Sequence, residues 1–295
     1  MDTNIDTGYD RSTDVDSPIS ESAWQQALYW LERADGLIIT AGAGMGVDSG
    51  LPDFRGNEGL WRAYPALRQS RLEFTRIASP AAFRREPELA WGFYGHRLEL
   101  YRKTTPHEGF AILRRWADRV AQGAFVYTSN VDGQFKKAGF LADRILECHG
   151  TLHWLQCMEV CRDALWTADG WVPEVDATAC RLLSPLPTCP ACGALARPNV
   201  LMFNDGDWVS TRTDHQQQRL ETWLSGVSQP VVVELGAGTA VPTVRWFGSM
   251  LNVPLIRINL RESEISKGQG VGLAGRALEV LSELDRRWNK EGTVA

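Results

Sequence analysis

The sequence predicts an α/β fold, a Rossmann-like doubly wound parallel sheet that carries a small zinc-binding and helical module. Three observations support this class. Short apolar runs alternate with helical segments along the 295 residues, which is the pattern of parallel βαβ units. A glycine-rich loop, Gly42-Ala43-Gly44, directly follows the first apolar run, as phosphate-binding loops do in dinucleotide folds. Two cysteine pairs lie in a later segment that interrupts the alternation.

Apolar runs bounded by polar residues or glycine predict the strands. They cover residues 37–40, 124–128, 144–148, 200–203, 230–235 and 254–259. Helical spacing of apolar residues predicts a first helix over residues 22–31. Further helical segments between the strands cover residues 106–120, 241–250 and 274–287.

The same pattern predicts how the chain is divided. Residues 1–20 are acidic and rich in Asp, Ser and Thr, so we expect a disordered tail. Residues 21–56, 106–150 and 199–290 are expected to form the Rossmann-like domain. Residues 57–105 form a helical insert and residues 151–198 a cysteine-containing insert, and together they build a small domain over the sheet edge.

Bulk composition excludes several classes of protein. A formal net charge of -5 gives no electrostatic reason to bind nucleic acid or an anionic membrane. No apolar run approaches the roughly 20 residues that span a bilayer. The N-terminus lacks the basic start and apolar centre of a secretion signal. We therefore expect a cytoplasmic protein whose six cysteines do not form disulfides.

Chemically distinctive residues follow the predicted strands, at the point where each strand ends. They are Gly42, Ala43 and Gly44, then Asn130 and Asp132, then His149, then Gly236, Ala237, Gly238 and Thr239, and finally Asn259. Ligands of open α/β sheets bind at this carboxyl edge. Glycines there let the backbone approach a phosphate closely. The sequence thus predicts one crevice that binds a phosphate-containing ligand.

Four cysteines have the spacing of a structural zinc site. Cys157 and Cys161 form a C-x3-C pair, and Cys189 and Cys192 form a C-x2-C pair. Four thiolates leave no open coordination position, so this zinc is expected to be structural. The alternatives are buried or redox-active pairs, a site that has lost its metal, or Cys180 in place of Cys161.

At this point the motifs resemble those of the sirtuins, which are NAD-dependent protein deacylases. The matching stretches are Gly42-Ala43-Gly44, Ser49 through Gly56, Thr128 through Gly133, His149-Gly150, the cysteine pairs, Arg197 through Phe203, and Ile258-Asn259. The resemblance implies NAD as co-substrate, an acylated protein as partner, and release of nicotinamide and O-acyl-ADP-ribose. The acyl amide oxygen attacks C1′ of the nicotinamide ribose, and a general base then activates a ribose hydroxyl.

The resemblance also implies roles for individual residues. His149 matches the general base, and an imidazole suits proton transfer at neutral pH. Asn130 and Asp132 match the nicotinamide pocket and count with His149 as catalytic. The expected cofactor contacts come from Gly42, Ala43, Gly44, Asp53, Phe54, Arg55, Ser129, Asn130, Asp132, Gly236, Ala237, Gly238, Thr239 and Asn259. Val200 and Phe203 match the region that receives the substrate peptide.

Tyr94 and Arg97 match a Tyr-x-x-Arg pair that some sirtuins use for acidic acyl groups such as succinyl. A phenol and a guanidinium one helical turn apart can hold a carboxylate. The sequence therefore adds desuccinylation to deacetylation as an expected activity. The alternative is a core tyrosine beside a surface arginine.

Several positions depart from the family pattern. Gly46 stands where serine is usual, and Ser129 where glutamine is usual. Gln134-Phe135 replaces Leu-His, Asn204-Asp205 replaces Gly-Glu, and residues 236–240 replace Gly-Thr-Ser-Leu. We expect NAD binding to survive these changes, while rate and peptide preference change. An NAD glycohydrolase, a protein ADP-ribosyltransferase and a non-enzymatic NAD sensor are the alternative functions.

Overall fold

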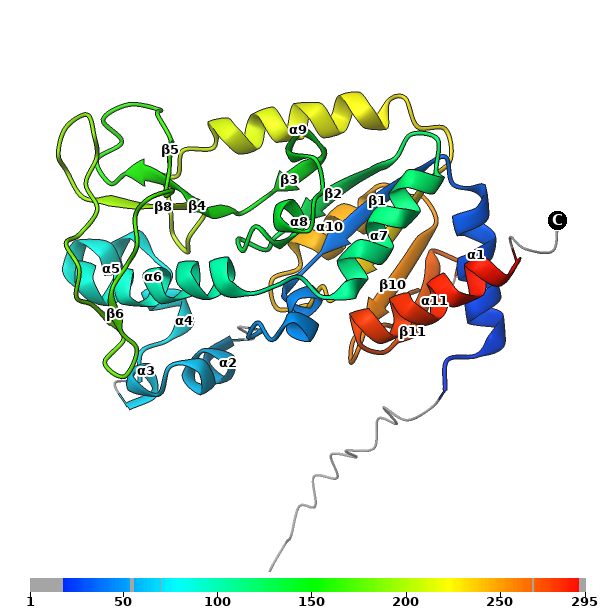
Figure 1. The fold of residues 1–295 in the computed structure, drawn as a ribbon, viewed down its shortest axis with the longest axis horizontal. Coiled ribbons are helices and arrows are strands. Elements are labelled where there is room, and N and C mark those ends of the chain that lie inside the picture. Colours follow the sequence, from blue (N-terminus) through cyan, green and yellow to red (C-terminus); the bar gives the residue numbers. More distant parts are fainter. Residues whose placement is uncertain (1–17, 54–55, 70, 267, 292–295) are drawn as a thin grey trace, which may run out of the picture.

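A computed structural model describes residues 18–53, 56–69, 71–266 and 268–291. The main sheet is parallel, with the strand order β11-β10-β9-β1-β2-β3 (Figure 1). These strands are β1 (Gly36–Ala41), β2 (Ala124–Thr128), β3 (Ile145–Glu147), β9 (Pro230–Leu235), β10 (Leu255–Asn259) and β11 (Gly270–Ala274). Renumbered along the chain, this is the 3-2-1-4-5-6 order of a Rossmann fold, which reverses between β1 and β9. The predicted fold class is confirmed.

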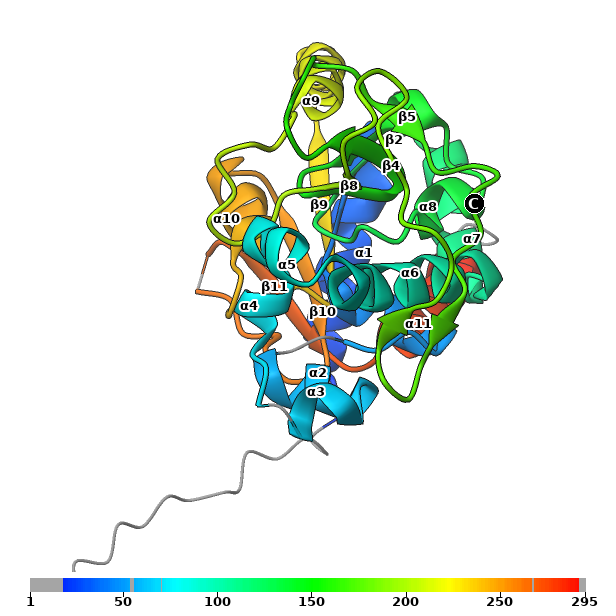
Figure 2. The same ribbon diagram turned by 90° about the vertical axis from the view of Figure 1, so that its left-hand side faces the viewer.

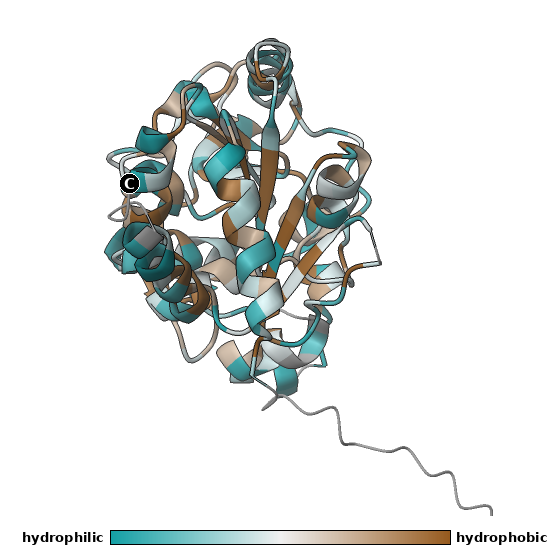
Figure 3. Cartoon of the chain, turned by 90° about the vertical axis from the view of Figure 1, so that its right-hand side faces the viewer, coloured by the Kyte–Doolittle hydropathy of each residue, from teal (hydrophilic) through white to brown (hydrophobic). Residues whose placement is uncertain are grey.

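Helices cover both faces of this sheet because its strands bury side chains on both sides. In β1, Leu37 and Ile39 face one apolar cluster, whereas Ile38 faces another. The first cluster is covered by α1 (Glu21–Arg33), α7 (Glu108–Arg119) and α11 (Ala277–Glu291), and the second by α9 (Thr211–Leu224) and α10 (Thr243–Met250). Figure 3 shows the apolar strands enclosed between helices whose outer faces are hydrophilic.

The chain enters this domain at a capped helix. The Ser20 hydroxyl accepts a hydrogen bond from the Ala23 amide at 3.2 Å, and Glu21 lies in the positively polarised first turn. The predicted tail falls mainly on residues 1–17, which lie outside the described residues.

Two segments that are distant in sequence share one apolar core in the small module (Figure 2). The first contains α2 (Gly56–Ala63), α3 (Pro65–Gln69), α4 (Phe74–Ile77), α5 (Pro80–Arg85) and α6 (Pro87–Lys103). The second contains β4 (Gly150–Cys157), β5 (Trp166–Thr167), β6 (Val175–Asp176), β7 (Arg181–Leu182) and β8 (Ala196–Val200). Trp91 on α6 illustrates the join, because its indole N–H donates to the Ala196 carbonyl at 2.9 Å. The domain limits 57–105 and 151–198 stay a prediction.

One sequence prediction about the strands is wrong, and one strand was not predicted. Residues 200–203 do not form a strand of the main sheet. The strand there is β8, and it pairs antiparallel with β4 in a separate sheet of order β5-β4-β8. The pairing partner decides this, since the chain leaves the main sheet after β3 and β4, which begins at Gly150, lies in the separate sheet.

The sixth parallel strand is instead β11, which was not predicted from the sequence. A Cβ on Gly270 would lie 2.3 Å from the Leu255 carbonyl oxygen, and one on Gly272 would lie 2.2 Å from that of Ser263. Such close backbone approach requires glycine, which removes the apolar side chains by which a strand is recognised. Helix α9 was also missed, because only Gln216, Leu220 and Trp223 of its residues are buried. Three short elements complete the description, namely α8 (Gln134–Lys137), η1 (Ala43–Ser49) and η2 (Ala142–Arg144).

Candidate active site

A cavity of about 530 Å³ lies between the carboxyl edge of the main sheet and the small module. Its lining includes eleven residues that the sequence singled out: Gly42, Ala43, Ser129, Asn130, Asp132, His149, Gly236, Ala237, Gly238, Arg97 and Phe203. The strand order brings the ends of β1, β2 and β9 side by side at the point where the order reverses. Residues almost 200 positions apart therefore face one space.

Hydrogen bonds hold the ends of β1 and β2 together. The Thr128 hydroxyl donates to the Ala41 carbonyl at 2.9 Å, and the Asn130 side-chain amide donates to the Gly42 carbonyl at 3.0 Å. The Ser129 amide also donates to the Ala41 carbonyl. Asn130 thereby fixes the glycine loop as well as facing the cavity.

The glycine loop packs against the end of β9 backbone to backbone. The Gly44 amide donates to the Gly236 carbonyl at 3.0 Å, and a Cβ on Gly44 would lie 2.7 Å from the Gly236 Cα. Any side chain at either position would force the two turns apart. These glycines line the cavities without side chains, so a phosphate could approach their backbone closely and the residues present fit a dinucleotide.

Asp132 is a buried carboxyl group on the cavity wall. Its Oδ1 atom accepts the Gln134 amide at 2.9 Å, and His153 Nε2 lies 3.0 Å from its carbonyl oxygen. Burial raises the pKa of Asp132 to about 6, assisted by Glu147 and opposed by the Gln134 amide and by Arg97. Asp132 can therefore change its charge close to neutral pH.

His149 follows β3 and faces the same cavity. Its ring nitrogens have no hydrogen-bond partner among the described residues, and burial lowers the pKa of the imidazole below 6.5. The ring is thus neutral at pH 7 and available to accept a proton. Gly150 makes the bend after it, with φ of 74° and no space for a side chain, since a Cβ would lie 2.0 Å from the Asn199 carbonyl oxygen.

A second cavity, of about 430 Å³, adjoins the first and shares Leu51, Pro52 and Gly236 with it. Gly44, Asp53 and Asn259 line it, and their role as cofactor contacts stays a prediction. Phe54 and Arg55 lie outside the described residues. Their expected role in the cofactor loop stays a prediction.

Asn259 and Thr239 are engaged with the protein itself. The Asn259 amide donates to the Ala237 carbonyl at 2.9 Å, and its oxygen accepts the amides of Arg261 and Glu262. Thr239 lines neither cavity, because its amide and hydroxyl donate to the Glu262 carboxylate. The structure therefore places both residues where they shape the loops after β9 and β10.

Arg97 and Tyr94 remain neighbours, with the guanidinium carbon 5.8 Å from the centre of the Tyr94 ring, but Tyr94 does not line the cavity. Arg97 lines the first cavity, and its Nε and Nη2 atoms donate to the Tyr101 hydroxyl at 3.0 and 2.7 Å. Tyr94 is 1% exposed and packs against Phe83 and Phe93 in the core of the small module. The phenol that accompanies Arg97 in the cavity wall is Tyr101, four residues further along α6. Its helical spacing to Arg97 was the only signal in the sequence that could have found it.

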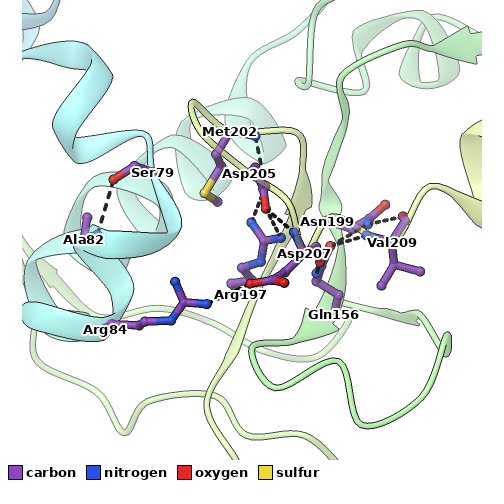
Figure 4. A network of polar contacts seen from close by, with 10 residues as sticks. All are labelled: Ser79, Ala82, Arg84, Gln156, Arg197, Asn199, Met202, Asp205, Asp207 and Val209. Atoms are coloured by element: carbon purple, nitrogen blue, oxygen red, sulfur yellow. Dashed lines mark hydrogen bonds and ion pairs between the residues drawn. The ribbon is translucent and has the colours of Figure 1, made fainter.

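The loop after β8 carries Phe203 into the cavity lining, while Val200 is buried and pairs with Gly150. Arg197 and Asp205 form an ion pair at the base of this loop (Figure 4). Asn204 has φ of 54°, a left-handed conformation that asparagine tolerates better than most residues. Asparagine can therefore stand where the family pattern has glycine.

Four cysteines converge in the small module. The sulfur atoms of Cys157, Cys161, Cys189 and Cys192 all lie within 4.8 Å of one another. The Sγ atoms of Cys157 and Cys192 are 3.6 Å apart, as are those of Cys161 and Cys189. Tetrahedral zinc with Zn–S bonds of about 2.3 Å requires sulfur separations of roughly 3.8 Å. The four thiols fit zinc, and Cys180 is not part of the cluster.

Comparison with known proteins matches residues 42–281 to the model of the Sir2 family. An NAD-dependent protein deacylase of Thermococcus kodakarensis is 31% identical over 87% of this chain and 92% of its own length.

The chain belongs to the Sir2 family.

Other Sir2-family relatives have the same name. An NAD-dependent protein deacylase of Daphnia pulex is 32% identical over 85% of this chain and 92% of its own length. One from Archaeoglobus fulgidus is 30% identical over 90% of this chain and 98% of its own length. Among solved structures, a mutant Sir2 homologue in complex with ADP-ribose superposes with a TM-score of 0.69 at 24% identity, covering 94% of this chain and 99% of that one. A Sir2 homologue in complex with NAD superposes with a TM-score of 0.68 at 24% identity, covering 90% of this chain and 94% of that one. These structures share the fold described above.

Proposed function

We propose that this Sir2-family chain is an NAD-dependent protein lysine deacylase. One observation carries the proposal: His149, Asn130 and Asp132 face a single cavity, and a second cavity adjoins it at the glycine loops. A dinucleotide extended through both would place its reactive end beside the histidine and its phosphates at the glycines. The relatives named NAD-dependent protein deacylase support this assignment.

The residues divide the work between binding and proton transfer. When bound, NAD would supply the activated bond between nicotinamide and C1′ of the ribose. Asn130 and Asp132 would orient the nicotinamide. His149 would accept a proton from a ribose hydroxyl, because its imidazole is neutral and has no competing partner in the described chain.

An acylated polypeptide is the proposed partner. Strand β8 is an edge of its sheet, and Phe203 extends from the following loop into the cavity lining. An extended peptide can add to such an edge through its backbone. Arg97 beside Tyr101 supports removal of acidic acyl groups as a second activity.

The deciding assay measures nicotinamide release from NAD with and without acetyl- and succinyl-lysine peptides, with products identified by mass. Peptide-dependent release and formation of acyl-ADP-ribose are expected. His149→Ala should lower deacylation about 10²- to 10⁴-fold while peptide-dependent nicotinamide exchange persists. Equal release without peptide would instead identify a glycohydrolase, and labelling of an acceptor protein a transferase.

We also propose a cytoplasmic location. None of the six cysteines forms a disulfide, in agreement with a reducing compartment. No helix in the described part of the chain has the length and apolar character needed to cross a membrane.

A further inference from the structure

We infer that the second cavity accepts an adenosine ribose carrying a 2′-phosphate, so that this chain uses NADP as well as NAD. The inference rests on the proposed function. His149 and Asp132 assign the nicotinamide end of the co-substrate to the first cavity, and Gly44 and Gly236 assign the phosphates to the junction. The adenosine half of the dinucleotide would then bind in the second cavity.

Dinucleotide folds that select NAD place a carboxylate on the ribose diol, whereas those that accept NADP place an arginine near the 2′-phosphate. Two of the carboxylates close to this cavity are already occupied. Asp48 accepts the Leu278 amide at 2.9 Å and lies 3.4 Å from Arg276 Nη1, and its side chain is 8% exposed. Glu262 is turned away from the cavity by its bonds to Thr239.

Asn259 does not offer a substitute, since both ends of its amide hold the loops after β9 and β10. Asp53 is the remaining carboxylate on the wall, and it has an interaction partner of its own. The end of β10 therefore presents no available carboxylate to a ribose diol.

Guanidinium groups, rather than an available carboxylate, line the second cavity. Arg261, two residues after β10, and Arg62 on α2 both line the cavity. Neither forms an ion pair with another described residue, in contrast to Arg276, and both side chains are exposed. A guanidinium binds a phosphate through two parallel hydrogen bonds. Two cations without carboxylate partners among the described residues line one cavity, which exceeds what a neutral ribose requires and matches a phosphorylated one.

The test measures binding directly, by calorimetry of ADP-ribose and 2′-phospho-ADP-ribose on the full chain. The wild-type dissociation constants are expected to agree within about threefold. Arg261→Glu should raise the dissociation constant of 2′-phospho-ADP-ribose by about 10- to 100-fold and that of ADP-ribose by less than about threefold. Arg261→Gln should show a smaller shift in the same direction. Arg68→Glu makes the same charge change on neighbouring α3, outside both cavities, and should alter neither constant.

The activity arm compares NADP with NAD in nicotinamide release on one acetyl-lysine peptide. Wild-type protein should release nicotinamide from both dinucleotides. The Arg261→Glu variant should lose activity with NADP selectively. If ADP-ribose binds but 2′-phospho-ADP-ribose binds about 30-fold more weakly or worse, the inference is overturned and the proposed function stands. If neither ligand binds, the NAD site itself is overturned.

Discussion

Arg197 and Asp205 form an ion pair through two hydrogen bonds, Nη1 to Oδ2 at 2.6 Å and Nη2 to Oδ1 at 2.8 Å, with side chains only 1% and 0% exposed. The same carboxylate also accepts the backbone amides of Met202 and Asp207 (Figure 4). One buried aspartate thus folds the loop that carries Phe203 back onto β8. The aspartate in place of the usual glutamate is therefore a structural element of the loop.

Asp205→Ala is expected to destabilise the protein by about 3–5 kcal/mol, because it leaves the Arg197 guanidinium buried without its partner. The double variant Arg197→Met/Asp205→Leu should lose less stability than Asp205→Ala, since no buried charge remains. Urea denaturation of both variants measures this difference. A double variant less stable than Asp205→Ala would contradict the explanation.

The four-cysteine cluster is expected to bind one zinc ion for each chain. Cys161→Ser and Cys192→Ser should lose the metal and lower the melting temperature, because the ion joins the two ends of a long insert. Cys180→Ser is the matched control and should retain full zinc content, since Cys180 lies outside the cluster. Metal analysis of the purified variants decides, and zinc loss from the Cys180 variant would instead place that residue among the ligands.

Asp132 is expected to destabilise the fold above pH 6. Its carboxyl pKa is raised from 3.8 to about 6 by burial, so the folded state binds the proton more tightly than the unfolded chain. Stability from this group is present at low pH and declines as the pH rises from about 4 to about 6. Asp132→Asn should therefore stabilise the protein at pH 8, by on the order of 1–3 kcal/mol, and impair nicotinamide release.

The check on Asp132 is a pair of denaturation curves at pH 8 and at pH 4. The advantage of the asparagine variant should shrink toward zero at the lower pH, where Asp132 is protonated in the folded protein. An advantage of equal size at both values would show that the carboxyl charge is not its cause.

Arg97, which bonds the Tyr101 hydroxyl in the cavity wall, is expected to set the preference for acidic acyl groups. Arg97→Met should reduce kcat/KM for a succinyl-lysine peptide at least about tenfold more than for an acetyl-lysine peptide, because a charge-assisted pair to the carboxylate is lost. Tyr101→Phe should shift the ratio in the same direction. Tyr94→Phe should leave it unchanged, since that ring is buried away from the cavity. An unaltered ratio in Arg97→Met would exclude this role.

The sequence by itself determined the strands that are apolar and the residues that end them. Residues 124–128 and 230–235 were located to the residue, because buried parallel strands leave an unmistakable apolar run. The glycine loop, Asn130, Asp132, His149 and the cysteine pairs were recognisable because their chemistry restricts the residue type at each position.

Tertiary structure alone decided what depends on contacts between distant segments. Strand β11 could not be recognised in the sequence. Two of its positions must be glycine because neighbouring carbonyl groups leave no space for a side chain, so the apolar run typical of a strand is missing. Residues 196–200 joined the small sheet because β4 was there to pair with them. Tyr94 turned into the core while Tyr101 reached the cavity, since the rotation of α6 is fixed by packing against the rest of the module. Local sequence specifies what a residue can do, and only the packing of elements specifies which neighbours it meets.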